Sequence, residues 1–316
     1  MTTQAHQQDN RLSQLAIAYS NMPNSFIAEQ VAMRTPANKY GQYQKFSDGS
    51  FFQAVETRMA YGARAQEIVT ASSLEAFSLD SHGVDAFIDR AENRHVSADR
   101  ERMNLLEDAA LQSVLATMRI NHEVEVRDVV FDTTNYASAL QFALAGGDQF
   151  DNDASDPIKT ITNAIKEAIA RPNVAVCGMN VAHALRSNPN INKAVHRTNG
   201  DAGYQSLDSI AMVLGLDKII VGEAWAATSD NTAPTSRIWD SADTLALVRV
   251  GVPTDLRCAN AAAFAVTATE HGGMIVRKWN EDNRGPEGGT VIRPVDCRKV
   301  IHLSEISGAI ITNCLT

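Results

Sequence analysis

The strongest periodic pattern of hydrophobic positions lies in residues 97 to 131. Apolar side chains recur there every three to four positions without a Gly or Pro between them: Met103, Leu106, Ala110, Leu111, Val114, Leu115 and Met118. This spacing predicts one face of an α-helix, with Ser97 or Asp99 as its N-cap. A helix of roughly 25 to 30 residues is on the order of 40 Å long. One small core does not need so long a helix, so we expect it to support an extended subunit.

A second amphipathic pattern begins at Pro157, directly after the acidic stretch from Asp148 to Asp156. The apolar positions behind it are again three to four residues apart: Ile158, Ile161, Ile165, Ala168 and Ile169. Ser155 or Asp156 can cap the free backbone N–H groups, and Pro157 suits the first helical position, which needs no amide donor. Carboxylates also suit the positive end of the helix dipole. We therefore interpret the acidic stretch as the start of a helix over 157–170.

A calcium site is the alternative interpretation of the same acidic stretch. Asp151, Asp153 and Ser155 have the alternate spacing of the first three ligands in an EF-hand loop. The rest of that loop is missing, because Asp156 stands where the turn needs Gly and Thr162 stands where the closing Glu belongs. The helix start therefore explains more of these residues than calcium does.

The remaining patterns predict an α+β protein with extended segments at its beginning. Residues 1 to 24 are polar, and residues 25 to 78 contain alternating and β-branched pieces around a middle with Gly and Arg. SFIAEQVAM indicates a strand or short element, and YGQYQKF alternates. Between 131 and 252 helices and strands follow one another: a buried strand NVAVCGM, a helix VAHALRS begun by Asn180, a turn NPNIN, a helix SLDSIAMVLGL, and strands KIIVGEAWAA and SADTLALVRV. Residues 253 to 316 are rich in β patterns, with a turn from Asn283 to Gly289.

Composition and charge narrow the class of protein. The 316 residues are 44% hydrophobic, enough for one large or two modest cores. No apolar run approaches the roughly 20 residues of a membrane helix, and the first residues lack the apolar region of a signal peptide. A net charge of −9 argues against a surface that wraps phosphates. Cys177, Cys258, Cys297 and Cys314 form no CxxC pair, so we expect free thiols and neither disulfides nor zinc, with Cys177 buried.

Candidate chemistry is sparse, and we assign no catalytic, cofactor-binding or metal-binding residue. GxGxxG after a strand, a phosphate loop, GxSxG and HExxH are all missing from the sequence. Two histidines, His183 and His196, fit surface or capping positions in a short helix. Glu123 and Glu125 could act as an acid and base pair if they converged in a cleft. In a helix they point to different faces, and in a strand they form one solvated row between Val124 and Val126, so a polar face is the preferred interpretation. The three tryptophans are expected in the core or at interfaces: Trp225, Trp239 and Trp279.

Taken in order, these segments resemble the major capsid protein of tailed bacteriophages, whose fold is shared with encapsulin shells and the floor domain of herpesvirus capsids. The stretch FSLDSHGVDAFIDRAE, leading into the long helix, is similar to the entry of that family's spine helix. SDPIKTITNAIKEAIARPNVAVCGMNVAHALRSNPNI is similar to the first half of the axial domain, and LGLDKIIVGEAW with LALVRV to the second half. The resemblance covers nearly the whole chain, although each motif tolerates many substitutions.

The resemblance implies a division of the chain and a structural role. It implies an N-terminal arm (1–24), an extended loop (25–78), a peripheral domain with the spine helix (79–130), an axial domain (131–252) and a β-rich peripheral return (253–316). Copies of the chain would form hexamers and pentamers of an icosahedral shell around double-stranded DNA, without tight sequence-specific binding of that DNA. Portal, scaffolding and decoration proteins are possible partners, and the virion, assembled in the host bacterial cytoplasm, is the expected location.

Three further expectations accompany this resemblance. Some relatives cross-link their subunits through a Lys and an Asn, but nothing marks an Asn partner or assisting Glu for Lys39 or Lys45, so we predict no cross-link. An encapsulin-like compartment shell is the alternative within the fold. A soluble α+β metal-binding enzyme using Asp148 to Asp156 is the alternative from another class.

Overall fold

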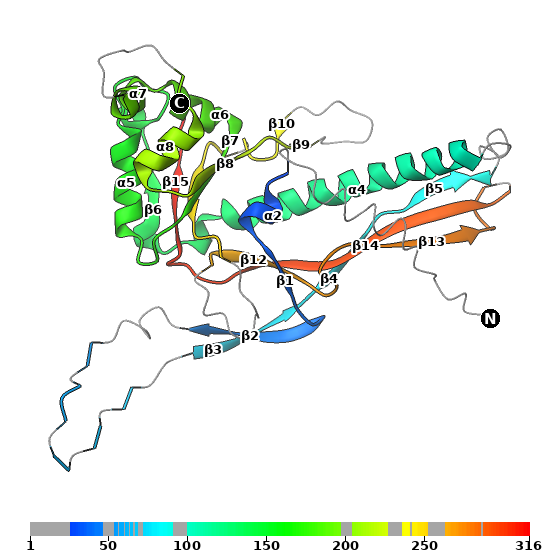
Figure 1. Cartoon of the computed structure of the whole chain (residues 1–316), viewed down its shortest axis with the longest axis horizontal. Helices are drawn as coiled ribbons and strands as arrows, with labels where there is room; N and C mark the ends of the chain where they lie inside the picture. The colour runs from blue at the N-terminus through cyan, green and yellow to red at the C-terminus, as the bar shows by residue number, and fades with distance from the viewer. Residues whose placement is uncertain are drawn as a thin grey trace.

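The computed structural model is an elongated α+β molecule with a compact end, a long helix on a sheet, and a projecting hairpin (Figure 1). It describes residues 26–46, 54–55, 57–59, 61–62, 64–65, 67–68, 72–90, 100–196, 204–226, 236–240, 242–251, 263–285 and 287–316. The predicted arm, residues 1–24, therefore lies outside the described residues. The helix expected over 97–131 is present as α4 (Arg100–Val130).

A six-stranded sheet lies along α4, with the long strand β14 (Gly289–His302) at its centre. One edge of β14 pairs with β12 (Ala265–Thr269) and β13 (Ile275–Glu281), and the other edge pairs with β4 (Asp80–Gly83) and β5 (Ala86–Asp89). β1 (Arg34–Pro36) adds to β12 in parallel. Leu111, Val114, Leu115 and Met118 of α4 pack on Val276 and Ile292, which buries this part of the predicted apolar stripe. The side chains of Met103 and Leu106 are outside the described ones.

A five-stranded sheet forms the compact end in the order β6 (Gln141–Ala143), β15 (Gly308–Thr312), β11 (Leu245–Val248), β7 (Val174–Gly178) and β8 (Lys218–Gly222). One face is covered by α5 (Pro157–Glu167), α6 (Met179–Ser187), α7 (Pro189–His196) and α8 (Leu207–Leu214), which share one core with it. The other face packs on α2 (Ala28–Val31) and the end of α4. Because both faces are buried, β7 and β11 are hydrophobic throughout.

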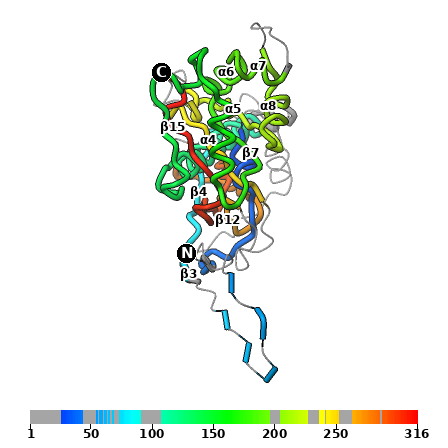
Figure 2. The backbone as a smooth tube through the Cα atoms, turned by 90° about the vertical axis from the view of Figure 1, so that its left-hand side faces the viewer, coloured from blue at the N-terminus to red at the C-terminus, as the bar shows by residue number. Residues whose placement is uncertain are grey.

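A long hairpin projects from the six-stranded sheet, away from the compact end. Its strands β2 (Tyr40–Phe46) and β3 (Ser72–Ser78) pair antiparallel over seven residues each. In a view turned by 90°, the helices α6 and α7 lie at the top of the molecule and β3 lies well below them (Figure 2). The chain reaches the hairpin through β1 and returns through β4, so these two strands form its root.

Small elements connect these parts. β9 (Trp225–Ala226) and β10 (Ser236–Arg237) form a two-stranded ribbon. Three single 3₁₀ turns follow α4: η1 (Thr133–Asn135), η2 (Ser138–Leu140) and η3 (Gly146–Asp148). Within the described part of the chain, no helix is both long and apolar enough to cross a membrane.

Two local predictions are corrected by the structure. NPNIN is not a turn, because Asn188 accepts from the N–H of Asn190 and Pro189 occupies the first position of α7. α6 begins at Met179 rather than at Asn180, and its N-cap is Gly178. Of the two possibilities for SFIAEQVAM, a strand or a short element, the structure shows the second, the short helix α2.

The C-terminal strand also lies elsewhere than the sequence suggested. β15 pairs with β11 and β6, so residues 308–312 belong to the five-stranded sheet, whereas β12 to β14 belong to the six-stranded one. The apolar side chains Ala309, Ile310 and Ile311 are completely buried there. Pattern alone identifies such a strand but not its partner, because many strands present a similar hydrophobic run.

Candidate functional site

The hairpin is held to the body by an apolar cluster on one face of the sheet. Tyr43 of β2 packs with Leu79, Val266, Ile301 and neighbouring residues. Its hydroxyl donates to Glu75 Oε2 at 2.5 Å, and burial, followed by this carboxylate, raises the pKa of Tyr43. The base of the hairpin is therefore packed like a core, although the rest of the hairpin projects into solvent.

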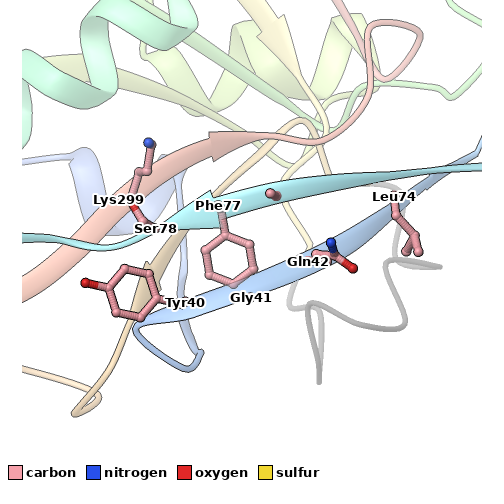
Figure 3. A pocket seen from close by; sticks show the side chains of 8 residues that line it. Tyr40, Gly41, Gln42, Leu74, Phe77, Ser78 and Lys299 are labelled. Carbon is pink, nitrogen blue, oxygen red and sulfur yellow. The ribbon is translucent and has the colours of Figure 1, made fainter.

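A shallow groove opens beside this cluster, between the hairpin and β14 (Figure 3). Tyr40 and Leu74 are 72% and 67% exposed, Phe77 lies over Gly41, and Lys299 stands at the rim. Exposed apolar patches on a protein surface mark sites of interaction with other molecules. The groove is therefore a candidate contact surface.

The opposite face of β14 carries buried charge. Asp296 and Arg298 lie two positions apart, so their side chains point to the same face, toward α4. Both are 0% exposed, and Arg298 Nη1 donates to Asp296 Oδ2 at 3.2 Å. From α4, Glu125 accepts two bonds from Arg298, 3.0 Å from Nε and 3.1 Å from Nη2. Two parallel charge-assisted bonds fix the guanidinium in direction as well as distance.

This network extends to both strands of the hairpin's root. Arg34 of β1 donates from Nη1 to Asp296 Oδ2 at 3.1 Å and from Nε to Glu29 Oε1 at 2.9 Å. His82 of β4 lies opposite Asp296 in the ladder, and its Nδ1 is 3.5 Å from Glu125 Oε1. We name these residues the root network: Glu29, Arg34, His82, Glu125, Asp296 and Arg298.

His122, a buried histidine, lies beside the root network and is neutral. His122 Nε2 is 3.1 Å from Thr267 Oγ1, whose single hydrogen is donated to the carbonyl of Ala32 at 3.1 Å. His122 Nε2 is therefore the donor in their contact. Burial lowers the pKa of His122 well below its ordinary value, and the positive charges of Arg298 and Arg34 lower it further.

Glu123 forms a separate junction on another side of α4. Its Oε1 accepts from the N–H of Ala28 at 2.6 Å and its Oε2 from Trp239 Nε1 at 2.6 Å. It thus joins α4 to the start of α2 and to the loop before β11. Burial raises the pKa of Glu123 to about 7, although the hydrogen bonds from Ala28 and Trp239 oppose this rise.

The predicted acid and base pair is therefore divided. Glu123 and Glu125 point to different sides of the helix, as expected, but Glu123 is buried and not part of a polar surface. Each carboxylate is bound by its own donors, and the two do not converge in one site. Trp239 is the residue that could have predicted a buried Glu123, because the indole N–H of a buried Trp needs a hydrogen-bond acceptor.

The acidic stretch before α5 serves local structure. Asp156 is the N-cap and accepts from the N–H of Lys159 at 3.1 Å, with Pro157 at the first helical position, as predicted. Asp151 accepts from Thr316, and these hydrogen bonds lower the pKa of Asp151. Ser155 is buried and bonded to Asn188. In the parts of the chain that the structure describes, no group of three or more His, Cys, Asp or Glu has a metal-binding arrangement.

The other predicted residues have structural positions. Cys177 is completely buried, as expected, and burial raises its pKa; Cys297 and Cys314 are also free thiols, whereas Cys258 lies outside the described residues. His183 is exposed on α6, its ring 5.4 Å from that of Tyr204; the side chain of His196 is not among those described.

The tryptophans have three different environments. Trp239 is 0% exposed in the core, with its ring edge-on to Phe131 at 5.3 Å. Trp225 is 46% exposed and lies under the guanidinium of Arg237, and Trp279 is partly buried under that of Arg293. Only Trp239 is thus a core residue of the subunit.

The fold and the exposed hairpin are those of a shell-forming subunit, and comparison with known proteins identifies the family. The chain is 30% identical over 217 residues to the major capsid protein of Pseudomonas phage JBD67, covering 68% of each chain. It is 26% identical over 284 residues to the major capsid protein of Burkholderia phage BcepMu, covering 87% of this chain and 88% of the relative. This chain belongs to the family of phage major capsid proteins.

Solved structures agree on the fold. The structure is similar to that of a phage-related protein of Bordetella bronchiseptica RB50, with a TM-score of 0.75 at 19% identity, covering 98% of this chain and 99% of that one. No family model matches the sequence.

Proposed function

We propose that this protein is the structural subunit of an icosahedral capsid, assembling as hexamers and pentamers that close around double-stranded DNA. The sequence match to phage major capsid proteins carries the proposal. The projecting hairpin with exposed Tyr40 and Leu74 supports it, because exposed apolar patches mark surfaces at which proteins associate. Closed symmetry lets many modest contacts add up to a stable shell.

We infer a division of labour among the parts of the chain. Residues 1–24 and the hairpin clasp neighbouring subunits. The six-stranded sheet with α4 forms the peripheral domain. The five-stranded sheet with α5 to α8 forms the axial domain at the capsomer centre, and this domain includes β15 in addition to the predicted range 131–252.

We assign the subunit no catalytic activity. Its relatives are named as capsid proteins, and the candidate carboxylates Glu123 and Glu125 are each bound by structural donors. We also propose no covalent cross-link through Lys39 or Lys45. Monomer bands, rather than ladders, on a denaturing gel of purified shells are the expected result.

Partners and location follow from the same role. The subunit associates mainly with copies of itself, and portal, scaffolding and decoration proteins are candidate partners. Its net charge of −9 fits a lumen that encloses DNA without gripping it. Assembly takes place in the host cytoplasm, and the final location is the virion.

An encapsulin-like compartment and a metal-dependent enzyme are less favoured. Both curated relatives with recognisable sequence similarity are phage capsid proteins. The acidic stretch on which the enzyme alternative rests caps α5 and binds the C-terminal residue. Nucleic acid inside native particles would support the viral role, and packaged enzymes would support the compartment.

Sedimentation of the expressed full chain, with negative-stain images of the fastest fraction, tests the proposal. Hollow shells or free rings of five and six subunits are expected. A monomer of 34.2 kDa that stays monomeric at high concentration and with crowding agents would contradict it.

A further inference from the structure

The hairpin's root contains an uncommon feature, a set of fully buried charges. Asp296 and Arg298 are 0% exposed between the sheet and α4. Taking such charges out of water is costly, and apolar residues of similar size often give equal or greater stability. We therefore look for the role of this network in the orientation of the segments it joins, and not in added stability.

The contacts of the root network show which segments it orients, namely the strands that lead into and out of the hairpin. Asp296 accepts from Arg34 on β1, the strand that leads into the hairpin. Glu125 on α4 is 3.5 Å from His82 on β4, the strand that leads out of it. Arg298 joins the two halves by donating to both carboxylates. The network therefore bonds β1 to the long helix through Asp296 and Arg298, and it places His82 of β4 beside the same helix.

The two faces of β14 hold the hairpin through different kinds of interaction. On one face Tyr43 and Ile301 form an apolar contact, which is not directional. On the other face the hydrogen bonds from Arg34 to Asp296 and from Arg298 to Glu125 are directional, so a rotation of β1 against β14 weakens the bond from Arg34. The apolar face therefore holds the hairpin against the sheet, and the charged face sets the direction in which the hairpin leaves it.

We propose that Asp296 and Arg298 are positioning residues for assembly: through Arg34 and Glu125 they fix the direction in which the hairpin leaves the subunit. This inference rests on the proposed function, because it concerns how the hairpin reaches a neighbour. It predicts that a subunit without the network keeps its compact end but presents the hairpin over a range of directions.

The decisive variant is Asp296→Asn, with Asp85→Asn as its matched control. Both substitutions remove a carboxylate that binds an arginine of or near β14, but Asp85 lies in the turn between β4 and β5 and pairs with Arg293 near the surface. Pulsed electron paramagnetic resonance would measure the distance between genetically encoded spin labels at the exposed positions Ser73 on β3 and Asn121 on α4. Such labels leave the native cysteines unmodified.

The expected result has two parts. Wild-type and Asp85→Asn subunits give one narrow distance distribution and assemble, whereas Asp296→Asn gives a distribution at least twice as wide and at least tenfold less shell at equal concentration. Hydrogen exchange of β7 and β11 should be unchanged, which separates a turned hairpin from an unfolded subunit.

A narrow distribution in Asp296→Asn, or normal shells despite a wide one, would overturn the proposal, even if thermal stability fell. If Asp296→Asn does not fold, Arg34→Gln decides by the same two measurements, because it removes the bonds from β1 to Asp296 and Glu29 and leaves Arg298 paired with Asp296 and Glu125. Failure of the wild-type chain to form shells would instead refute the proposed function, while the distance distributions of free subunits would still test the network.

Discussion

Single side chains of this subunit have environments that their sequence neighbours do not reveal. Glu123 and Glu125 are two positions apart, yet one is a buried acceptor for Ala28 and Trp239 and the other holds a buried arginine. The partners of Glu123 are 95 and 116 residues away along the chain. Helical periodicity predicted that the two would point apart, but only the packing decides which of them loses water.

Glu123 should make the stability of the subunit depend on pH. Its pKa is raised from 4.5 to about 7 in the folded state, so the folded protein holds a proton that the unfolded chain has released between these values. Stability should therefore fall as pH rises from about 4.5 to 7, by about 3 kcal/mol at about 1.4 kcal/mol per pKa unit.

Urea unfolding of wild type and Glu123→Gln at pH 5 and pH 8 measures this effect. The variant should be closer to wild type in stability at pH 8 than at pH 5, because it has no charge to bury. Glu167→Gln, on the exposed face of α5, is the control. An equal wild-type to variant difference at both pH values would show that Glu123 does not titrate in this range.

Gly222 is required for close packing of Trp239. A Cβ at this position would overlap the indole ring, which is completely buried. Gly222→Ala should therefore destabilise the subunit by about 1–3 kcal/mol through overpacking. Gly147→Ala, where a Cβ meets no atom within 4 Å, should melt within experimental error of wild type. Equal melting temperatures for the two variants would argue against the contact.

Among the secondary-structure elements, α5 shows how far local rules extend. Its cap, its proline and the apolar positions Ile158, Ile161 and Ile165 were predicted, because each depends on residues within one or two turns. The predicted end was wrong, because α5 stops at Glu167 and Ile169 is exposed. Asp156→Ala should cost about 1 kcal/mol by removing the acceptor for the N–H of Lys159. Asp153→Ala, three residues earlier and exposed, should be neutral in the same denaturant titration. If both cost the same, the cap is not the source of the effect.

Predictions from neighbouring residues fail for elements whose structure depends on contacts with distant parts of the chain. α7 was predicted as a turn because NPNIN is rich in turn residues, but Asn188 and Pro189 start a helix when Ile191 can be buried against its neighbours. β15 was placed with the C-terminal strands because it follows them in sequence. Its pairing with β11 depends on complementary buried faces, which a hydrophobic run does not specify.

In the molecule as a whole, exposed apolar side chains on the hairpin predict which surface assembles. Tyr40→Ser with Leu74→Ser should leave a folded subunit, because both side chains are mostly exposed, but should reduce shell formation at least tenfold. Ile169→Ser with Met212→Ser, equally exposed on the compact end, tests whether any loss of surface hydrophobicity has this effect. Sedimentation of both double variants gives the answer, and equal loss of shells would remove the special role of the hairpin.

The sequence by itself determined the long helix, the α5 start, several of the strands and the family, because each depends on short-range periodicity, capping chemistry or recognisable similarity. Only the tertiary structure decided that β14 lies at the centre of the sheet, that β15 joins the compact end, and that Asp296 and Arg298 meet Glu125 and Arg34 in a buried network. The physical reason is range. Helix and turn energies come from residues within a few positions, whereas burial and ion pairing depend on which distant segments the folded chain brings together.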